Sequence, residues 1–241
     1  MCSTCGCGEE SHHAHQTLRR LRIEENLLAT NERYAQANRA WLAGRGIAMV
    51  NLMASPGAGK TSLLVRTLTD LAGKMAFAVI EGDQQTSLDA ERIRACGVKA
   101  VQINTGKACH LDAHQVGHAL TALDPPHGAL VLIENVGNLV CPAGFDLGES
   151  KRIVLLSVTE GDDKPLKYPY MFHSADLIVV TKLDLLPYVE FDLDRCLAYA
   201  RRLQPKIQAL ALSAKTGAGM KAWYAWLTRL AQPVGLSAST A

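Results

Sequence analysis

A glycine-rich stretch, Ala54-Ser55-Pro56-Gly57-Ala58-Gly59-Lys60-Thr61, leaves few folds open to this chain, because it lies between an apolar run and a helix-like segment. In a phosphate-binding loop, glycines let backbone N–H groups approach phosphate oxygens, the lysine reaches the β- and γ-phosphates, and the threonine hydroxyl can ligate Mg²⁺. The helix that follows directs its positive end at the anion. We therefore expect a nucleotide to contact Gly57, Ala58, Gly59, Lys60, Thr61 and Ser62.

The loop departs from the usual pattern, G-x-x-x-x-G-K-[ST], because Ala54 takes the place of the first glycine. Alanine is the smallest change available at that position. A glycine-rich turn with an incidental lysine is the alternative. However, the apolar run, the glycines, Gly59-Lys60-Thr61 and the helical segment follow one another in the required order, which favours a nucleotide site.

Apolar runs alternate with helical patterns over most of the chain. Runs such as 129–133 and 177–180 are apolar throughout, as strands covered on both faces are. The pattern predicts an α/β fold with a doubly wound, mostly parallel sheet of the P-loop NTPase type. Strands are expected at 47–53, 75–81, 98–103, 129–134, 152–158, 176–181 and 207–212, and helices at 61–72, 86–95, 111–123, 190–203 and 218–231.

The same patterns divide the chain into four parts. Residues 1–15 have almost no apolar content and are expected to form a flexible metal-binding tail. Strong helix formers without Gly or Pro predict a helix at 16–43, within an N-terminal helical region, 16–45, that packs on the main domain. The P-loop nucleotide-binding domain is expected at 46–231, and residues 232–241 as a frayed tail.

Charge and hydropathy exclude several classes of protein. The formal net charge of +2 gives no electrostatic case for nucleic-acid binding. No apolar run approaches the roughly 18 residues that a membrane span needs, and no apolar signal region marks the N-terminus for secretion. The cysteines are odd in number and three are crowded at the N-terminus, which indicates free thiols and a reducing, cytoplasmic location.

Two acidic loops follow predicted strands, at the sheet edge where a doubly wound fold binds its ligand. Glu81-Gly82-Asp83 places a carboxylate near Mg²⁺ or an attacking water. Glu134-x-x-Gly137 combines an acid for the metal with a glycine N–H for the γ-phosphate. Either acid alone is equally explained by a helix cap or a surface charge. Together they predict Mg²⁺ binding by Thr61, Asp83 and Glu134, and a catalytic group made of these residues and Lys60.

Two further motifs follow the last two predicted strands and resemble the guanine-specificity motifs of GTPases: Thr181-Lys182-Leu183-Asp184 and Ser213-Ala214-Lys215. The Asp184 carboxylate can accept from N1–H and the exocyclic amine of guanine, a pattern that adenine does not offer. A backbone N–H near Ala214 can donate to guanine O6, and the Lys182 stem can lie along the base. These features predict GTP over ATP. Thr181 stands where asparagine is usual, which weakens the bracing expected from that amide.

The N-terminal motif Cys2-x-x-Cys5-x-Cys7 gathers three soft donors. Thiolates with optional imidazoles, here His12, His13 and His15, suit Zn²⁺, Ni²⁺, Cu(I) or an iron–sulfur cluster. A redox Cys-x-x-Cys pair, a tag-like tail and incidental cysteines are the alternatives. The redox pair normally lies in a βαβ context, which is absent at this end of the chain, and a tag carries more histidines. A metal site is therefore predicted at Cys2, Cys5 and Cys7.

A second group of metal-binding residue types lies further along the chain. Cys109 and His110 are adjacent at an expected strand-to-helix corner, where both side chains can converge on one ligand. Cys141 lies in a segment whose shape should respond to the γ-phosphate. Each of the three alone is better explained as a buried thiol or a helix-start histidine. Cys96 and Cys196 are expected to be core thiols in helical contexts. His114 follows His110 by one turn and could be an auxiliary ligand, but a solvated helix position is favoured.

Together these motifs resemble HypB, the family of nickel-incorporation GTPases of [NiFe]-hydrogenase maturation. The similarity covers nearly the whole chain, from the N-terminal cysteines through the phosphate-binding loop, Glu81-Gly82-Asp83 and Cys109-His110 to Ser213-Ala214-Lys215. Its most specific part is Glu134-Asn135-Val136-Gly137-Asn138-Leu139-Val140-Cys141-Pro142, since a generic GTPase has no reason to carry this stretch.

The resemblance implies GTP hydrolysis, a GTP-dependent homodimer, nickel delivery to the hydrogenase large subunit, and partnership with the small accessory protein HypA. It also implies a Ni²⁺ or Zn²⁺ site made by Cys109, His110 and Cys141 near the dimer interface, and a high-affinity nickel site at the N-terminal cysteines. The chain lacks the long histidine-rich tract of storage-type members. Hydrolysis is expected to be slow, because no glutamine or arginine is evidently placed to orient water.

We expect GTP and Mg²⁺ to order the segment after Glu134 and so move Cys141 relative to Cys109 and His110, which changes metal affinity. The urease accessory GTPase is the nearest alternative, but the three-cysteine motif and Cys109-His110 argue against it. A GTP-regulated metal sensor or store is an alternative from another class. A store binds many ions and a sensor passes none on, so stoichiometry and transfer separate these functions.

Overall fold

The computed structural model describes residues 7–83, 88–106 and 108–231, with side chains described from residue 25 onward. Cys2, Cys5 and the tail at 232–241 lie outside the described residues. The side chains of Cys7, His12, His13 and His15 lie outside them as well. The N-terminal metal site therefore stays a prediction.

The described chain forms one sheet of seven parallel strands in the order β3-β2-β4-β1-β5-β6-β7. The bounds of each strand lie within two residues of the predicted bounds. Runs that are apolar on both faces mark where a buried strand begins and ends. The strands are β1 (Ala48–Ala54), β2 (Phe77–Asp83), β3 (Lys99–Asn104), β4 (Leu130–Glu134), β5 (Lys151–Ser157), β6 (Leu177–Thr181) and β7 (Gln208–Ala211).

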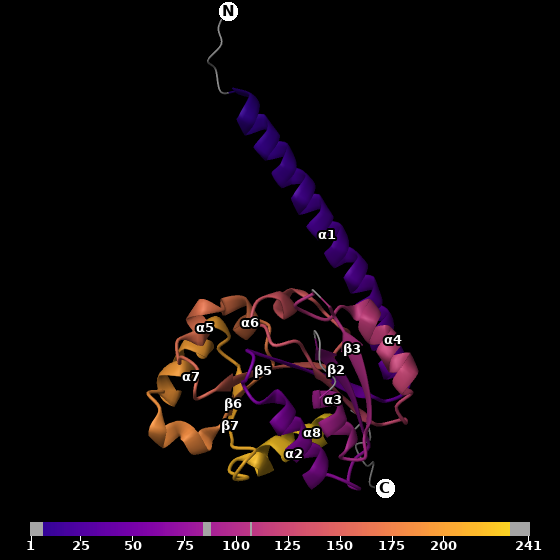
Figure 1. Ribbon diagram of the computed structural model, residues 1–241, viewed down its shortest axis with the longest axis vertical. Helices are drawn as coiled ribbons and strands as arrows, with labels where there is room; N and C mark the ends of the chain where they lie inside the picture. Colours follow the sequence, from indigo (N-terminus) through magenta and orange to yellow (C-terminus); the bar gives the residue numbers. More distant parts are fainter. Residues whose placement is uncertain (1–6, 84–87, 107, 232–241) are drawn as a thin grey trace, which may run out of the picture.

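Helices cover both faces of this sheet, so the predicted doubly wound fold is confirmed (Figure 1). One face packs against α2 (Lys60–Asp70), α3 (Leu88–Arg94) and α8 (Met220–Ala231). The other packs against α4 (Ala113–Leu123), α6 (Pro169–His173), α7 (Leu193–Leu203) and the end of α1 (Cys7–Ala43). Two 3₁₀ helices, η1 (Cys141–Gly144) and η2 (Leu183–Tyr188), and the short α5 (Lys164–Lys167) lie in loops after strands.

Side chains along the central strand β1 alternate between these two faces. Val50 and Leu52 pack into the core shared with α2 and α8, whereas Met49 packs into the core shared with α1 and α4. All three are fully buried. The strand that leads into the phosphate-binding loop is therefore held from both sides, which fixes where the loop begins.

The long helix α1 begins at Cys7, so the prediction of a flexible tail extending to residue 15 is wrong for the described residues 7–15. Figure 1 shows that the first part of α1 projects from the body, while its last part lies beside α4. Asn38 fastens that last part by donating to the carbonyls of Ala113 and Leu147 at 2.7 and 2.9 Å.

Several helix boundaries follow from capping that the apolar pattern did not reveal. Asp112 accepts from Gln115 N at 2.8 Å, so α4 begins after it and not at the predicted residue 111. The short helices α5 and α6 were not predicted, and each has a proline in its first turn, where no backbone N–H is needed. Among the described residues, no helix combines the length and hydropathy needed to cross a bilayer.

Candidate functional site

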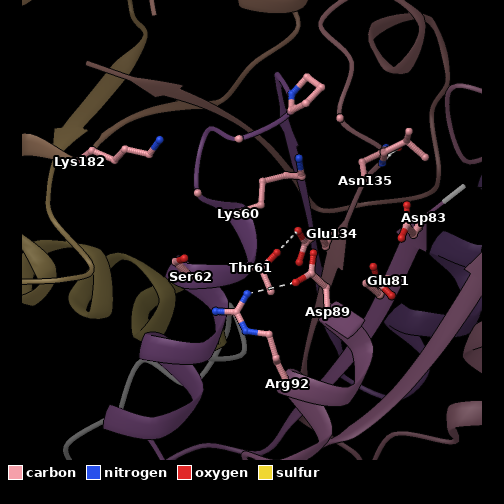
Figure 2. A pocket seen from close by; sticks show the side chains of 16 residues that line it. Lys60, Thr61, Ser62, Glu81, Asp83, Asp89, Arg92, Glu134, Asn135 and Lys182 are labelled. Atoms are coloured by element: carbon pink, nitrogen blue, oxygen red, sulfur yellow. Dashed lines mark hydrogen bonds and ion pairs between the residues drawn. The ribbon is translucent and has the colours of Figure 1, made fainter. Parts of the chain in front are cut away.

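The phosphate-binding loop connects β1 to α2 and forms one wall of a cavity (Figure 2). Gly57 and Gly59 have φ angles of 75° and 95°, in the region that favours glycine. Lys60 begins α2, and burial lowers its pKa while the Glu134 carboxylate opposes that shift. Ala54, which replaces the usual first glycine, is the last residue of β1 and is fully buried without a positive φ. An alanine therefore fits this position.

The cavity over the loop has a volume of about 570 Å³. It lies at the carboxyl ends of β2 and β4, as predicted for a doubly wound sheet. Figure 2 shows side chains from the loop, both strands, α3 and the turn at Lys182 around one space. Its lining residues are Pro56, Gly57, Gly59, Lys60, Thr61, Ser62, Glu81, Gly82, Asp83, Asp89, Arg92, Glu134, Asn135, Val136, Gly137 and Lys182.

Two buried carboxylates face this cavity from neighbouring strands. Glu81 and Glu134 are register partners in β2 and β4, and they are only 2% and 5% exposed. Burial raises the pKa of each to about 7. The Thr61 hydroxyl donates to Oε1 of Glu134 at 2.7 Å, whereas Oε2 of both glutamates is buried with no hydrogen-bond partner in the described chain.

These oxygens fit the Mg²⁺ ion that a phosphate-binding loop works with. Mg²⁺ prefers hydroxyl and carboxylate oxygens and is held by one or two carboxylates together with substrate phosphates. Thr61 and Glu134 supply such oxygens side by side, and Asp83 lines the same cavity from the last position of β2. The unpartnered Oε2 of Glu134 is a further acceptor that a cation would satisfy.

The predicted guanine motifs meet beside the loop. Thr181 donates from its hydroxyl to the Ala58 carbonyl at 2.6 Å, so it braces the phosphate-binding loop at the position where asparagine is usual. Lys182 has a φ of 58° and lines the cavity. The Ser213 hydroxyl donates to Oδ1 of Asp184 at 2.5 Å, which ties the two motifs together. The turn then continues with Ala214 and the exposed Lys215.

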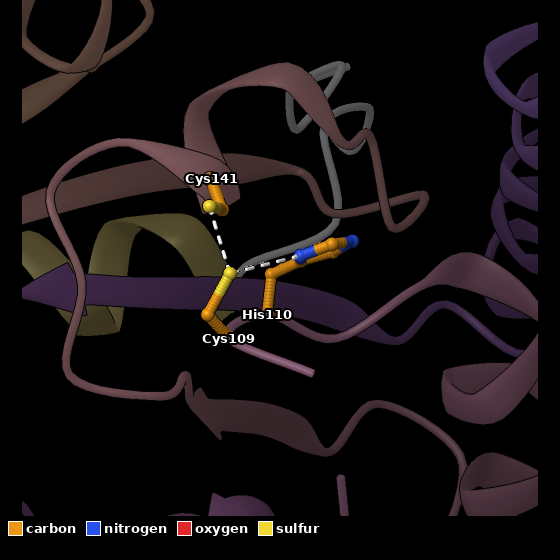
Figure 3. A group of neighbouring side chains, drawn as sticks. All are labelled: Cys109, His110 and Cys141. Atoms are coloured by element: carbon orange, nitrogen blue, oxygen red, sulfur yellow. Dashed lines mark hydrogen bonds between the residues drawn. The ribbon is translucent and has the colours of Figure 1, made fainter. Parts of the chain in front are cut away.

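Three predicted metal ligands lie together in the loops after β3 and β4 (Figure 3). The ligand atoms of Cys109, His110 and Cys141 all lie within 4.8 Å of one another, and the side chains are partly buried. The two sulfurs are 2.8 Å apart, and Sγ of Cys109 is 3.8 Å from Nδ1 of His110. Two thiols and an imidazole are donors suited to Zn²⁺ and to other borderline or soft metals.

The surroundings of His110 favour the neutral form of its imidazole. The His110 ring lies against Phe145 with centroids 3.9 Å apart, and burial lowers the pKa of His110 although Asp112 opposes the shift. The hydrogen bond to Cys141, followed by burial, raises the pKa of Cys109. Because thiolates and neutral imidazoles are the ligating forms, metal binding here is expected to release protons mainly from the thiols.

Asn138 holds the two cysteine-bearing loops against each other. Its Nδ2 donates to the Cys109 carbonyl at 3.3 Å. Its Oδ1 accepts from the backbone N–H groups of Val140 at 2.7 Å and Cys141 at 3.4 Å. One amide side chain therefore spans from one thiol-bearing backbone to the other.

The segment 134–141 borders both sites. Asn135 is 1% exposed, lines the nucleotide cavity and accepts from Leu111 N at 3.4 Å, just after the metal cluster's His110. A Cβ at Gly137 would lie 3.0 Å from Cα of Pro56, so the segment lies directly on the phosphate-binding loop. Cys141 ends the same segment in the metal cluster.

Other predicted candidates do not join either site. His114 is exposed on α4, its ring lies tilted against that of Tyr34 with centroids 4.6 Å apart, and it lies outside the cluster. Cys196 is a core thiol, as predicted, and burial raises its pKa to about 12. Cys96 is only half buried in the turn after α3 and packs on the edge of the core, so the prediction of a helical core position is wrong for it.

Sequence reasoning missed four polar residues of the nucleotide cavity, namely Glu81, Asp89, Arg92 and Asn135. Glu81 and Asn135 belong to the two acidic loops that follow predicted strands, and this position could have identified them as residues of the nucleotide site. Asp89 and Arg92 lie on α3, where an acid and a base three residues apart look like an ordinary solvated pair.

Sequence comparison gives matches along most of the chain. The family model described as "CobW/HypB/UreG, nucleotide-binding domain" matches residues 48–211, which contain both the cavity and the cysteine cluster. The hydrogenase maturation factor HypB of Azotobacter vinelandii is 60% identical over 211 residues, covering 88% of this chain and 70% of that protein.

Solved structures give the same picture. The crystal structure of HypB from Archaeoglobus fulgidus aligns with a TM-score of 0.79 at 42% identity, covering 85% of this chain and all of that one. The crystal structure of HypB from Helicobacter pylori in complex with nickel aligns with a TM-score of 0.79 at 37% identity, covering 88% of this chain and all of that one. The similarity therefore extends through sequence and fold alike.

Proposed function

Because the chain belongs to the CobW/HypB/UreG family, and within it to the hydrogenase maturation factors HypB, we propose that it is a GTP-hydrolysing nickel carrier for [NiFe]-hydrogenase. One observation carries the proposal: the segment 134–141 lines the nucleotide cavity and also contributes Cys141 to the metal cluster. A carrier needs its metal affinity to change between loading and release, and a shared segment supplies a physical connection for that change.

The nucleotide is bound by groups with distinct tasks. Lys60 and the loop N–H groups bind the β- and γ-phosphates, and the Gly137 N–H contacts the γ-phosphate. Asp184 selects guanine, and Ser213 orients its carboxylate. Thr61, Glu134 and Asp83 would hold Mg²⁺, and the bound ion would supply positive charge to neutralise the phosphates.

Nickel is the cargo in this proposal. The donor set of Cys109, His110 and Cys141 suits Ni²⁺ and Zn²⁺, and the Helicobacter pylori relative was crystallised in complex with nickel. We assign a second nickel site to Cys2, Cys5 and Cys7. Three histidines beside those cysteines are too few for bulk storage.

GTP couples to the cargo through the shared segment. A γ-phosphate bound at Gly137 biases the position of 134–141, and Asn138 carries that bias to the backbone of both cysteines. Linkage then requires that nucleotide and metal change each other's affinity by the same factor. In many GTPases, a switch segment is ordered by contacts with the γ-phosphate of GTP and is released after hydrolysis.

Partners follow from the maturation role that the relatives' names state. The acceptor is the precursor of the hydrogenase large subunit, and a HypA-type accessory protein takes part in the transfer. GTP promotes a homodimer with the cysteine cluster near its interface. Free thiols at the metal sites need a reducing compartment, which supports a cytoplasmic location.

Transfer of labelled nickel to the purified large-subunit precursor tests the proposal. With GTP and Mg²⁺, the wild-type protein should deliver about one ion per metal site, whereas Lys60→Ala and Cys141→Ser should deliver little. Cys96→Ser is the matched control, because it removes a half-buried thiol outside the cluster. Full delivery by Lys60→Ala would mean that nucleotide is not needed, and binding of many ions without transfer would indicate a store.

A further inference from the structure

The helix α3 presents a charged pair to the nucleotide cavity. Nη1 of Arg92 lies 3.2 Å from Oδ1 of Asp89, three residues earlier on the same helix. Both residues line the cavity, and Figure 2 shows their side chains in the same space as Thr61 and Glu134. The two side chains are 54% and 40% exposed, so packing does not lock them in this arrangement.

The pair acts electrostatically on groups that serve the phosphates. Asp89 opposes the burial-induced fall in the pKa of Lys60. Arg92 lowers, and Asp89 raises, the pKa of Glu134. These charges therefore lie within reach of the loop lysine and of the carboxylate beside Thr61, where the phosphate groups of a nucleotide bind.

The cavity lining carries more acids than bases. Its carboxylates are Glu81, Asp83, Asp89 and Glu134, and its cations are Lys60, Arg92 and Lys182. A nucleoside triphosphate adds further negative charge, so the site gains from every cation that can turn to the phosphates. Pairing Arg92 with Asp89 withholds one of the three.

We propose that Arg92 exchanges Asp89 for phosphate oxygens when a guanine nucleotide binds, and that it is a phosphate-contacting residue of this site. The inference rests on the proposed function, because it requires a guanine nucleotide in this cavity. It adds a residue to the site that the phosphate-binding loop and the strand-end acids do not include.

The exchange is favourable because Arg92 interacts more strongly with a phosphate than with the Asp89 carboxylate. An exposed acid–base pair on one helix is held weakly and is screened by salt. A guanidinium makes two parallel charge-assisted hydrogen bonds to a phosphate, and Arg is suited to this geometry. Asp89 keeps Arg92 near the cavity, and the more highly charged phosphate outcompetes it.

Nucleotide affinities of four proteins test the contact: wild type, Arg92→Ala, Arg92→Lys and Arg94→Ala. Arg94 is exposed on the same helix and does not line the cavity, so it matches the loss of charge without the contact. Each protein is titrated with GDP, a non-hydrolysable GTP analogue and guanosine. For Arg92→Ala we expect about tenfold or greater weakening for both nucleotides and no change for guanosine. Arg92→Lys should be intermediate, and Arg94→Ala should resemble the wild type.

A second variant tests the exchange. Asp89→Asn should bind GDP at least as tightly as the wild type, because the competing carboxylate charge is gone. Weaker binding by this variant would overturn the exchange, since Asp89 would then serve the nucleotide itself.

The outcomes separate this inference from the function on which it rests. Equal nucleotide affinities for Arg92→Ala and Arg94→Ala overturn the inference alone, provided that the wild type binds GDP. Equal losses for GDP and guanosine also overturn it, because they indicate a disturbed pocket and not a lost phosphate contact. Absence of guanine-nucleotide binding in the wild type overturns the inference and the proposed function together.

Discussion

Replacing Asn138 by alanine should weaken metal binding at the Cys109, His110 and Cys141 cluster while leaving the fold intact. The side chain makes hydrogen bonds of 3.3 Å to the Cys109 carbonyl and of 2.7 and 3.4 Å to the N–H groups of Val140 and Cys141. Counting the two shorter bonds at roughly 0.5–1.5 kcal/mol each gives about 1–3 kcal/mol.

Only part of this hydrogen-bond energy affects metal affinity, because the bonds also stabilise the two loops in the metal-free protein. Removing a group that orients metal ligands typically costs about 10–100-fold in affinity. We therefore expect nickel affinity to fall about tenfold, which corresponds to about 1.4 kcal/mol. The side chain is only half buried, so the variant should remain folded.

The assay is competition for Ni²⁺, and separately for Zn²⁺, against a chelator of known affinity. Gln204→Ala serves as the control, because its amide donates to the His173 carbonyl at 3.3 Å on a part of the surface that lines neither site. That control should bind metal like the wild type. Wild-type affinity in a folded Asn138→Ala protein would refute the reasoning that this amide holds the thiols in position.

Three further predictions concern the core and the nucleotide cavity. Thr67→Val leaves the buried Trp223 N–H, now 2.8 Å from the Thr67 hydroxyl, without an acceptor, and should lower the free energy of unfolding by about 1–3 kcal/mol in urea titrations; an unchanged midpoint would contradict this. Gly137→Ala places a Cβ 3.0 Å from Pro56 Cα, and fluorescence titration should show at least about tenfold weaker GTP binding; wild-type affinity would show that the segment yields freely. Burial raises the pKa of Glu134 from 4.5 to about 7 in the folded protein. Between these pH values the folded state therefore binds more protons than the unfolded state. The stability that this group contributes is fully present below pH 4.5 and is lost as pH rises through about 7. Glu134→Gln should flatten the pH dependence of thermal unfolding over that range, and an unaltered profile would disprove the shift.

Much of the fold is readable from the sequence because its signals are local. Strands such as β4 are apolar on both faces, and the glycine-rich loop follows β1 directly. The approach of Cys109 and His110 to Cys141 is consistent with the topology, since the loops after β3 and β4 leave the same edge of the sheet with only β2 between the two strands.

Other features depend on contacts between distant segments and leave no local signal. Arg92 resembles a solvated helix residue, and only the position of α3 beside the cavity brings it to the site. Asn138 stands in a recognisable motif, but its role depends on the Cys109 carbonyl, which comes from another loop. Thr181 likewise looked like a loss of bracing, yet its hydroxyl reaches the Ala58 carbonyl across the sheet edge.

The central claim is that the nucleotide state controls metal affinity through the segment 134–141. Its most direct test is the nickel affinity of the same protein saturated with a non-hydrolysable GTP analogue and with GDP, each with Mg²⁺. A difference of about fivefold or more, mirrored by an equal effect of nickel on the ratio of the two nucleotide affinities, is the predicted result. Equal nickel affinities in the two states would contradict the account.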